Sequence, residues 1–130
     1  PPVYLGSVGN PARFYRLLDV FCLPTLREGM PNVCLEAGAS AVPILTTNTT
    51  GAVDSISPNV TGILVEPGSA DALASGLQLL LEDEALRVKL ASESRSWVRE
   101  NFCEDAVIEE YVRFFELLVT PAHFKRRRAA

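Results

Sequence analysis

The chain has 130 residues, of which 48% are hydrophobic and 22% are charged, and its formal net charge is −4. This composition predicts one soluble α/β domain with a core of ordinary size. The negative charge argues against a nucleic-acid partner, and no apolar run approaches the roughly 18 residues that a membrane-spanning helix needs.

Short apolar runs between polar turns predict a sheet of buried parallel strands. A helix is expected at residues 10–17, before the second strand, and another helix starts near Pro31, after that strand. Strand, loop, helix and strand make a βαβ unit, and open sheets of this kind bind ligands at the carboxyl ends of their strands. The expected strands cover residues 3–6, 19–24, 43–47 and 62–65.

Three helices are expected after the last strand. Ser69 can cap the first, and the second covers residues 84–100. The third, residues 104–119, carries an apolar stripe wider than one sheet face requires, so we expect it to pack on a further lobe, and Pro121 ends it. The expected inward positions are Ala70, Leu73, Ala74, Leu77, Leu80 and Leu81 in the first helix and Leu86, Leu90 and Trp97 in the second.

The segment 27–37 holds the most informative motif, which combines a loop, a helix start and two glutamates. Pro31 suits the first turn of a helix, and Gly29 lets the preceding loop turn tightly. Such a start leaves backbone N–H groups without intrahelical partners, and together they form a site for an anion. The amides in question are those of Asn32, Val33 and Cys34.

Glu28 and Glu36 flank this helix start, eight residues apart. The carboxylate of Glu36 lies one to two turns into the helix and can accept from both hydroxyls of a vicinal diol such as a ribose. Glu28, on the entry loop, can accept from the hydroxyls of a second sugar. The alternative is that both are ordinary surface acids stabilised by the helix dipole. The strands on both sides of the motif favour the ligand site.

These segments, in this order, resemble the C-terminal, donor-binding domain of the family 4 glycosyltransferases, whose GT-B fold has two facing Rossmann-like lobes. The likeness covers roughly residues 3–119. Two residues depart from the family pattern: Ala41 replaces a glycine that is usual before Val-Pro, and Asp54 replaces a glutamate. An alanine is tolerated there if its backbone φ is negative. The segments that carry the likeness are 3–6, 18–25, 28–37, 42–47, 50–51 and 61–65.

The resemblance implies a Rossmann-like open parallel sheet with flanking helices, as one lobe of a GT-B enzyme. It also implies retaining transfer of a hexose from a nucleoside diphosphate sugar, with UDP-hexose as first choice, to an acceptor hydroxyl in polysaccharide or glycolipid synthesis. Neither a metal ion nor a cofactor is expected. Glu28 would be the catalytic residue that holds the transferred sugar, and Glu36 would hold the ribose. The amides of Gly29, Met30, Asn32 and Val33 would bind the sugar hydroxyls and the diphosphate.

The expected domain is therefore partial. Residues 1–120 are assigned to nucleotide-sugar binding and residues 121–130 to a basic tail. The acceptor-binding lobe and the basic residues that neutralise the diphosphate would precede Pro1, so the chain alone is expected to be inactive. A different class of function stays open, in which the chain is a non-catalytic module that binds nucleotides or pairs with another lobe.

Two further segments each allow two interpretations. Thr50-Gly51 closes a loop at the ligand edge of the sheet and is either a cleft contact or a plain tight turn. The basic run Lys125, Arg126, Arg127 and Arg128 is either a solvated end or a transient contact with an anionic membrane surface.

The three cysteines, Cys22, Cys34 and Cys103, lack the spacing of metal ligands and have apolar neighbours. They are expected to be small buried hydrophobic residues in a reducing compartment. The expected location is the cytoplasm, with peripheral contact at the inner membrane face as the further option.

Overall fold

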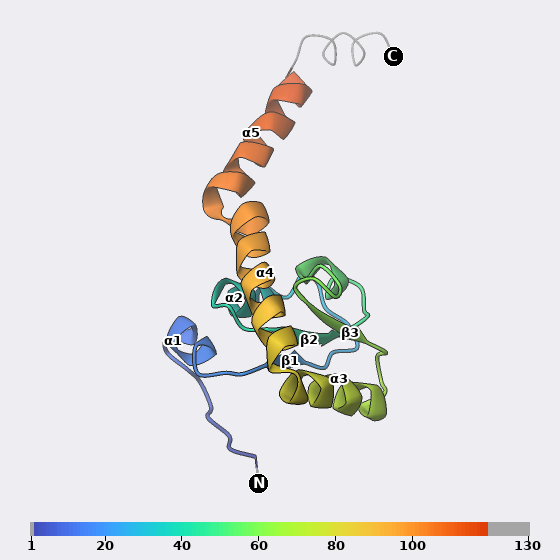
Figure 1. The fold of residues 1–130 in the computed structure, drawn as a ribbon. Coiled ribbons are helices and arrows are strands. Elements are labelled where there is room, and N and C mark those ends of the chain that lie inside the picture. Colours follow the sequence, from blue (N-terminus) through green and yellow to red (C-terminus); the bar gives the residue numbers. More distant parts are fainter. Residues whose placement is uncertain (1, 120–130) are drawn as a thin grey trace. The chain divides into compact units, whose positions relative to one another are not determined.

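The computed structural model describes residues 2–119 (Figure 1). They form two compact units, of which the first ends at Arg99 and the second begins at Glu100. The first unit holds the sheet and the glutamate motif. The basic run 125–128 lies outside the described residues, and the domain boundary expected at residue 120 stays a prediction.

The sheet has three parallel strands in the order β1-β2-β3. They are β1 (Phe21–Leu23), β2 (Ile44–Thr47) and β3 (Gly62–Val65). Cys22 lies opposite Leu45, which in turn lies opposite Ile63. The predicted open parallel sheet is confirmed.

The strand expected at residues 3–6 is wrong, because residues 2–10 contain no strand. Val3 and Tyr4 are 81% and 96% exposed. A strand exists only when a neighbour completes its hydrogen bonds, and none of the described strands pairs with this segment. An apolar run is therefore insufficient evidence for a strand.

The helices begin close to the expected residues, and one of them begins at the predicted cap, Ser69. The α1 helix (Pro11–Tyr15) starts where the Asn10 side chain accepts from the Arg13 N–H, and it is shorter than the expected 10–17. Ser69 Oγ accepts from the Ala72 N–H at 3.1 Å and caps α3 (Ala70–Glu82). The remaining helices are α2 (Asn32–Ala39), the short 3₁₀ helix η1 (Val53–Ser55), α4 (Glu84–Phe102) and α5 (Glu104–Val119).

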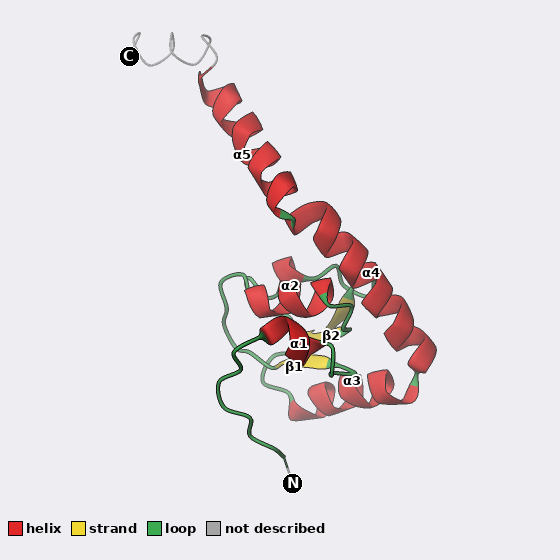
Figure 2. Cartoon of the chain, turned by 90° about the vertical axis from the view of Figure 1, so that its left-hand side faces the viewer, coloured by secondary structure: helices red, strands yellow, loops and turns green. Residues whose placement is uncertain are grey.

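Both faces of the sheet are covered, because side chains alternate along each strand. In β2, Ile44 packs with residues of α1 and α2, and the next residue, Leu45, packs with residues of α3 and α4. Figure 2 shows α2 and α3 on opposite sides of the strands. The first cluster is formed by Tyr15, Cys34, Ala37, Val42, Ile44 and Ile56, and the second by Leu45, Leu80 and Leu90 with Leu73, Leu77 and Leu86.

The inward face of α3 differs from the predicted stripe, because a glycine holds its centre. A Cβ on Gly76 would lie 2.8 Å from Leu45 Cδ1, so α3 sits too close to β2 for a larger residue. A pattern of apolar residues does not reveal a buried glycine. The predicted stripe therefore missed Gly76 and included residues that do not face inward. Ala70, Ala74 and Leu81, expected to face inward, are exposed.

A close approach of the same kind explains a buried polar residue of α4. Leu90 is buried as expected, while Leu86 and Trp97 are half-buried, and Ser94 is buried without having been expected. Ser94 Oγ lies 2.5 Å from where a Cβ on Gly38 would stand. Only small residues fit at this contact between α4 and α2.

Ala41 ends α2 in a backbone conformation that glycine usually adopts. Its φ is +58°, so the condition of a negative φ under which alanine was expected to be tolerated is not met. The Ala41 N–H donates to Gly38 O and the Val42 N–H to Ala37 O, which is the Schellman pattern of a helix end. An alanine in this conformation costs about 1 kcal/mol.

Candidate functional site

The entry loop of the motif is tied to the carboxyl end of β2. The Thr25 N–H donates to Thr47 Oγ1 at 3.2 Å, and the Thr47 hydroxyl donates to the Thr25 carbonyl. The Thr25 hydroxyl has two acceptors within reach, Glu28 Oε1 at 3.3 Å and the Arg27 carbonyl at 3.2 Å. Glu28 is half-buried, so its carboxylate stands at the sheet edge with one oxygen beside a donor of its own loop.

Gly51 supports the backbone of this loop. Its φ is +81°, and a Cβ there would lie 1.3 Å from the Gly29 carbonyl oxygen and 2.7 Å from that of Glu28. The turn after β2 therefore presses directly on the motif. Of the two interpretations of Thr50-Gly51, the structure supports a tight turn, and it adds a packing role that the sequence did not reveal.

The α2 helix begins at Asn32, with Pro31 as its cap residue. The Cys34 N–H donates to the Pro31 carbonyl at 3.0 Å, so the expectation that this amide lacks a partner is wrong. The first turn closes with a bond to the residue three positions earlier, which is common at helix ends. Asn32 and Val33 hold the first two helical positions, where an amide finds no acceptor inside the helix.

Glu36 lies on the exposed side of α2 and is held by a residue of α1. Tyr15 donates its hydroxyl hydrogen to Glu36 Oε2 at 3.0 Å. The Tyr15 ring is only 5% exposed and packs edge-on against Phe21, with ring centres 5.6 Å apart. Burial, followed by the hydrogen bond and charge of Glu36, raises the pKa of Tyr15 to about 12.

Sequence reasoning missed Tyr15. It belonged to the expected helix 10–17, but nothing along the chain shows that its hydroxyl meets a carboxylate 21 residues later. A tyrosine in an apolar helix before a buried strand is a weak signal of a long-range hydrogen bond, because a buried phenol usually needs a partner.

The phenol of Tyr15 should limit stability in alkali. Below pH 10, the ordinary pKa, folded and unfolded chains both keep the phenol proton. Between pH 10 and about 12 only the folded chain keeps it, so the free energy of unfolding falls as pH rises, by at most about 1.4 kcal/mol per pH unit. Tyr15→Phe should flatten this fall. Chemical denaturation of both proteins across this range checks it, and equal pH dependence would contradict it.

Cys34 connects the motif to the loop after β2. It is fully buried, as expected, whereas Cys22 and Cys103 are half-buried. Burial raises the pKa of the Cys34 thiol, a hydrogen bond with Ser55 partly offsets this rise, and the charge of Glu28 adds to it. The Cys34 thiol is therefore an uncharged packing group of the core, close enough to Glu28 to feel its charge.

Residues 2–119 contain neither a cluster of metal-ligating side chains nor a helix suited to cross a membrane. Within this range no three or more His, Cys, Asp or Glu side chains gather as metal ligands would. None of the helices in the same range is both long and apolar enough to cross a membrane.

The chain matches known proteins over most of its length. The profile of the family described as glycosyl transferases group 1 matches residues 3–97. The capsular polysaccharide biosynthesis glycosyltransferase CapM of Staphylococcus aureus is 40% identical over 108 residues, which are 83% of this chain and 28% of CapM. The chain thus spans less than a third of that relative.

Solved structures show the same fold. The C-terminal domain of LpcC, a glycosyl transferase group 1 family protein of Francisella tularensis, matches with a TM-score of 0.66 and 27% identity over 78% of this chain and 51% of that one. HepE of Anabaena, solved in complex with UDP and glucose, matches with a TM-score of 0.79 and 19% identity over 86% of this chain and 31% of HepE. The chain belongs to the glycosyl transferases group 1 family, and its fold is that of the C-terminal lobe of a GT-B glycosyltransferase.

Proposed function

We propose that the chain is the donor-binding lobe of a retaining glycosyltransferase, which moves a hexose from a nucleoside diphosphate sugar to an acceptor hydroxyl. The observation that carries the proposal is the placement of Glu28 and Glu36 on either side of the α2 start, with Glu28 beside the carboxyl end of β2. The UDP and glucose held by HepE support a UDP-hexose as donor. The name of CapM supports polysaccharide synthesis as the setting.

In this proposal the motif binds the donor from one end to the other. Glu36 accepts from the ribose hydroxyls, and the amides at the start of α2 face the diphosphate, where the helix dipole favours negative charge. Glu28 accepts from the transferred sugar and orients it for transfer. The amides proposed for the diphosphate and the sugar hydroxyls are those of Gly29, Met30, Asn32 and Val33.

The proposal includes neither a metal ion nor a cofactor. The α2 amides would neutralise part of the diphosphate charge, and basic residues elsewhere in a longer protein would neutralise the rest. Transfer also needs the acceptor held beside the donor and water kept away from the activated sugar. We therefore propose that a second lobe completes the site, and that the chain by itself binds the donor without transferring sugar.

Glu28 provides the test of this function. In a longer protein that contains this chain, Glu28→Gln should lower kcat for sugar transfer about 100-fold or more, because a transition-state contact is lost. Glu66→Gln, at an exposed acid on the loop after β3, is the matched control and should leave kcat unchanged. Full activity of Glu28→Gln would overturn the role of Glu28. Donor binding without transfer to any acceptor tried would favour the non-catalytic module.

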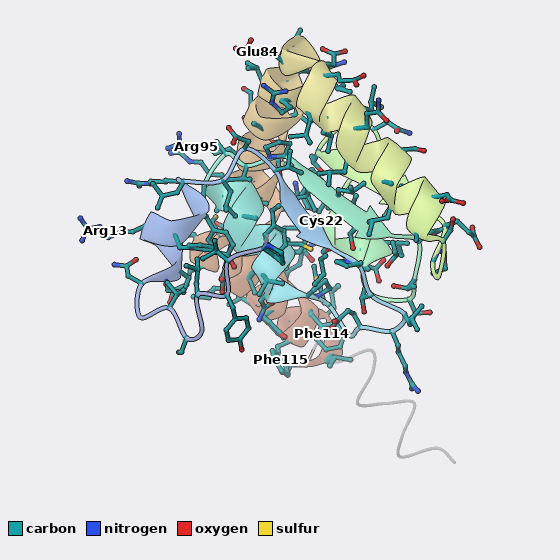
Figure 3. All side chains as sticks on the ribbon, turned by 90° about the horizontal axis from the view of Figure 1, so that it is seen from below. Arg13, Cys22, Glu84, Arg95, Phe114 and Phe115 are labelled. Atoms are coloured by element: carbon teal, nitrogen blue, oxygen red, sulfur yellow. The ribbon has the colours of Figure 1, made fainter. Side chains whose placement is uncertain are left out.

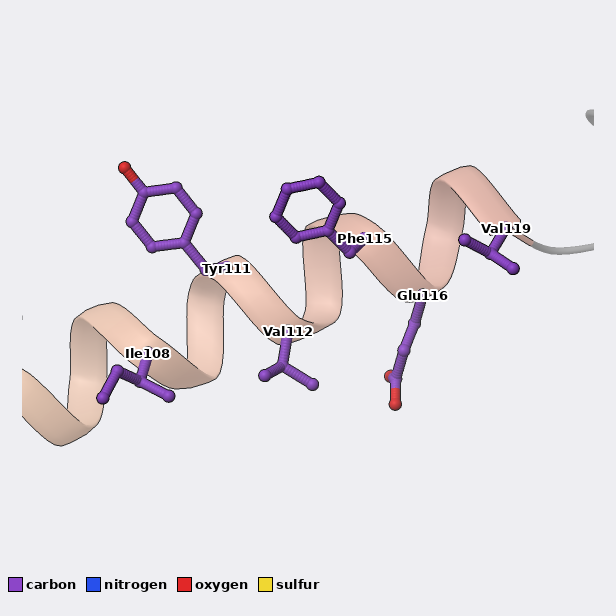
Figure 4. Close-up of a pocket in the computed structure, with 6 residues that line it drawn as sticks. All are labelled: Ile108, Tyr111, Val112, Phe115, Glu116 and Val119. Atoms are coloured by element: carbon purple, nitrogen blue, oxygen red, sulfur yellow. The ribbon is translucent and has the colours of Figure 1, made fainter.

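The second unit carries the surface proposed for the other lobe. None of the residues of α5 is buried, although most of its side chains are apolar. One face, drawn in Figure 4, is lined by Ile108, Tyr111, Val112, Phe115, Glu116 and Val119. Phe114 and Phe115 lie beside each other with ring centres 5.7 Å apart (Figure 3).

The chain studied alone should self-associate through α5, because an apolar helix without a partner leaves a large patch in water. Sedimentation should show oligomers, and Phe115→Glu should make the chain monomeric. Hydrogen exchange should show stronger protection of residues 104–119 in the longer protein than in the chain alone. A strictly monomeric chain with equal protection in both would show that α5 needs no partner lobe.

A further inference from the structure

We propose that Tyr15 is a positioning residue of the donor site, which holds the Glu36 carboxylate in the orientation that accepts the ribose hydroxyls. This inference rests on the proposed function, since it assumes that Glu36 meets the ribose. Tyr15 lies outside the glutamate motif, on a different helix. The link to the motif is the hydrogen bond from its hydroxyl to Glu36 Oε2.

The two side chains differ sharply in mobility. Tyr15 is 5% exposed, and its ring belongs to the first core cluster together with Cys34, Ala37 and Ile44. Glu36 is exposed and would otherwise sample several rotamers. The hydrogen bond thus ties an exposed carboxylate to a ring that the core immobilises. A carboxylate held in place before the ligand arrives loses less conformational entropy on binding.

The chemistry of the pair leaves room for the ligand. A carboxylate offers about four lone-pair sites on its two oxygens, and the phenol occupies one of them. The Oε1 atom and part of Oε2 stay available for two ribose hydroxyls. Because the pKa of Tyr15 is about 12, the phenol is a neutral donor at physiological pH. The thiol of Cys34, in the same core cluster, is likewise uncharged because burial raises its pKa. The phenol therefore occupies one acceptor site of the Glu36 carboxylate, and the other sites remain for the ribose.

A second explanation is that Tyr15 simply fastens α1 to α2, with no effect on the ligand. This explanation predicts equal effects on every nucleotide. A positioning role predicts an effect only on ligands whose hydroxyls meet Glu36. UDP carries both of these hydroxyls and 2′,3′-dideoxy-UDP carries neither, so this pair of nucleotides separates the two explanations.

The experiment is calorimetry of UDP and 2′,3′-dideoxy-UDP with a longer protein that contains this chain, as wild type and as Tyr15→Phe. In the variant, the affinity for UDP should fall about three- to tenfold, the size expected for one hydrogen bond, while the affinity for 2′,3′-dideoxy-UDP should change less than about twofold. The KM for the sugar donor should rise and kcat should hold. Tyr4→Phe, at a tyrosine that is 96% exposed, is the matched control and should change neither affinity.

The outcomes distinguish this inference from the proposed function. If wild type prefers UDP over 2′,3′-dideoxy-UDP and Tyr15→Phe keeps the same preference, the positioning role is wrong while the ribose contact stands. If wild type shows no preference, both are wrong. If the variant fails to fold, NMR of the wild type provides the test: the Tyr15 ring resonances should shift on addition of UDP and much less with 2′,3′-dideoxy-UDP. Equal shifts would overturn the positioning role.

Discussion

Gly51→Ala should lower the free energy of unfolding by about 2 to 5 kcal/mol. Two effects lower this free energy. An alanine with φ near +81° is strained, and its Cβ would lie 1.3 Å from the Gly29 carbonyl oxygen. The neighbouring atoms are backbone, so a rotamer change cannot relieve the contact. The loop must move, and with it the Glu28 carboxylate. Urea denaturation measures the loss of stability, and calorimetry with a nucleotide sugar should show weaker binding.

Gly68→Ala is the matched control for this substitution. Gly68 has a similar φ of +77°, but the nearest atom to an added Cβ is Leu26 Cδ2 at 4.0 Å. Gly68→Ala should therefore lower the free energy of unfolding only through the strained backbone conformation, by about 1 to 2 kcal/mol. The difference between the two variants measures how tightly the turn after β2 presses on the motif. Equal costs would contradict the packing role of Gly51.

Glu36→Ala should weaken nucleotide-sugar binding by about 1.5 to 3 kcal/mol, the size of a lost charge-assisted hydrogen bond. Calorimetry on a longer protein that contains this chain measures it, with Glu66→Ala as the exposed acidic control. An unchanged affinity would mean that this carboxylate does not hold the donor.

The same substitution should cost about 0.5 to 1.5 kcal/mol in stability, because the Tyr15 hydroxyl loses its acceptor. Removing that hydroxyl as well, in Tyr15→Phe/Glu36→Ala, should recover much of this stability and none of the affinity. A double variant that regained nucleotide binding would show that the affinity loss came from a disturbed fold rather than from the missing carboxylate.

Local signals in the sequence determined the parallel sheet, the order of its elements and the position of the motif. Ser69 capped α3 as expected, the strand at Gly62–Val65 has the expected bounds, and α2 begins directly after Pro31. Such signals suffice because caps and strand ends depend on neighbouring residues and on chain periodicity. They also predicted a ligand site around both glutamates, and Glu28 lies beside the carboxyl end of β2 through the bonds of Thr25, where ligands bind in this kind of sheet.

The tertiary structure alone decided what supports those glutamates. Tyr15 reaches Glu36 across 21 residues, and Gly51 presses on Gly29 from a different loop. The helix end at Ala41 adopts a positive φ that its side chain disfavours, and residues 3–6 form no strand because no neighbour among the described strands pairs with them. Each of these features depends on atoms that meet only after folding. The sequence by itself therefore predicted which residues form the site, and the packing of α1 and of the turn after β2 decided how those residues are held.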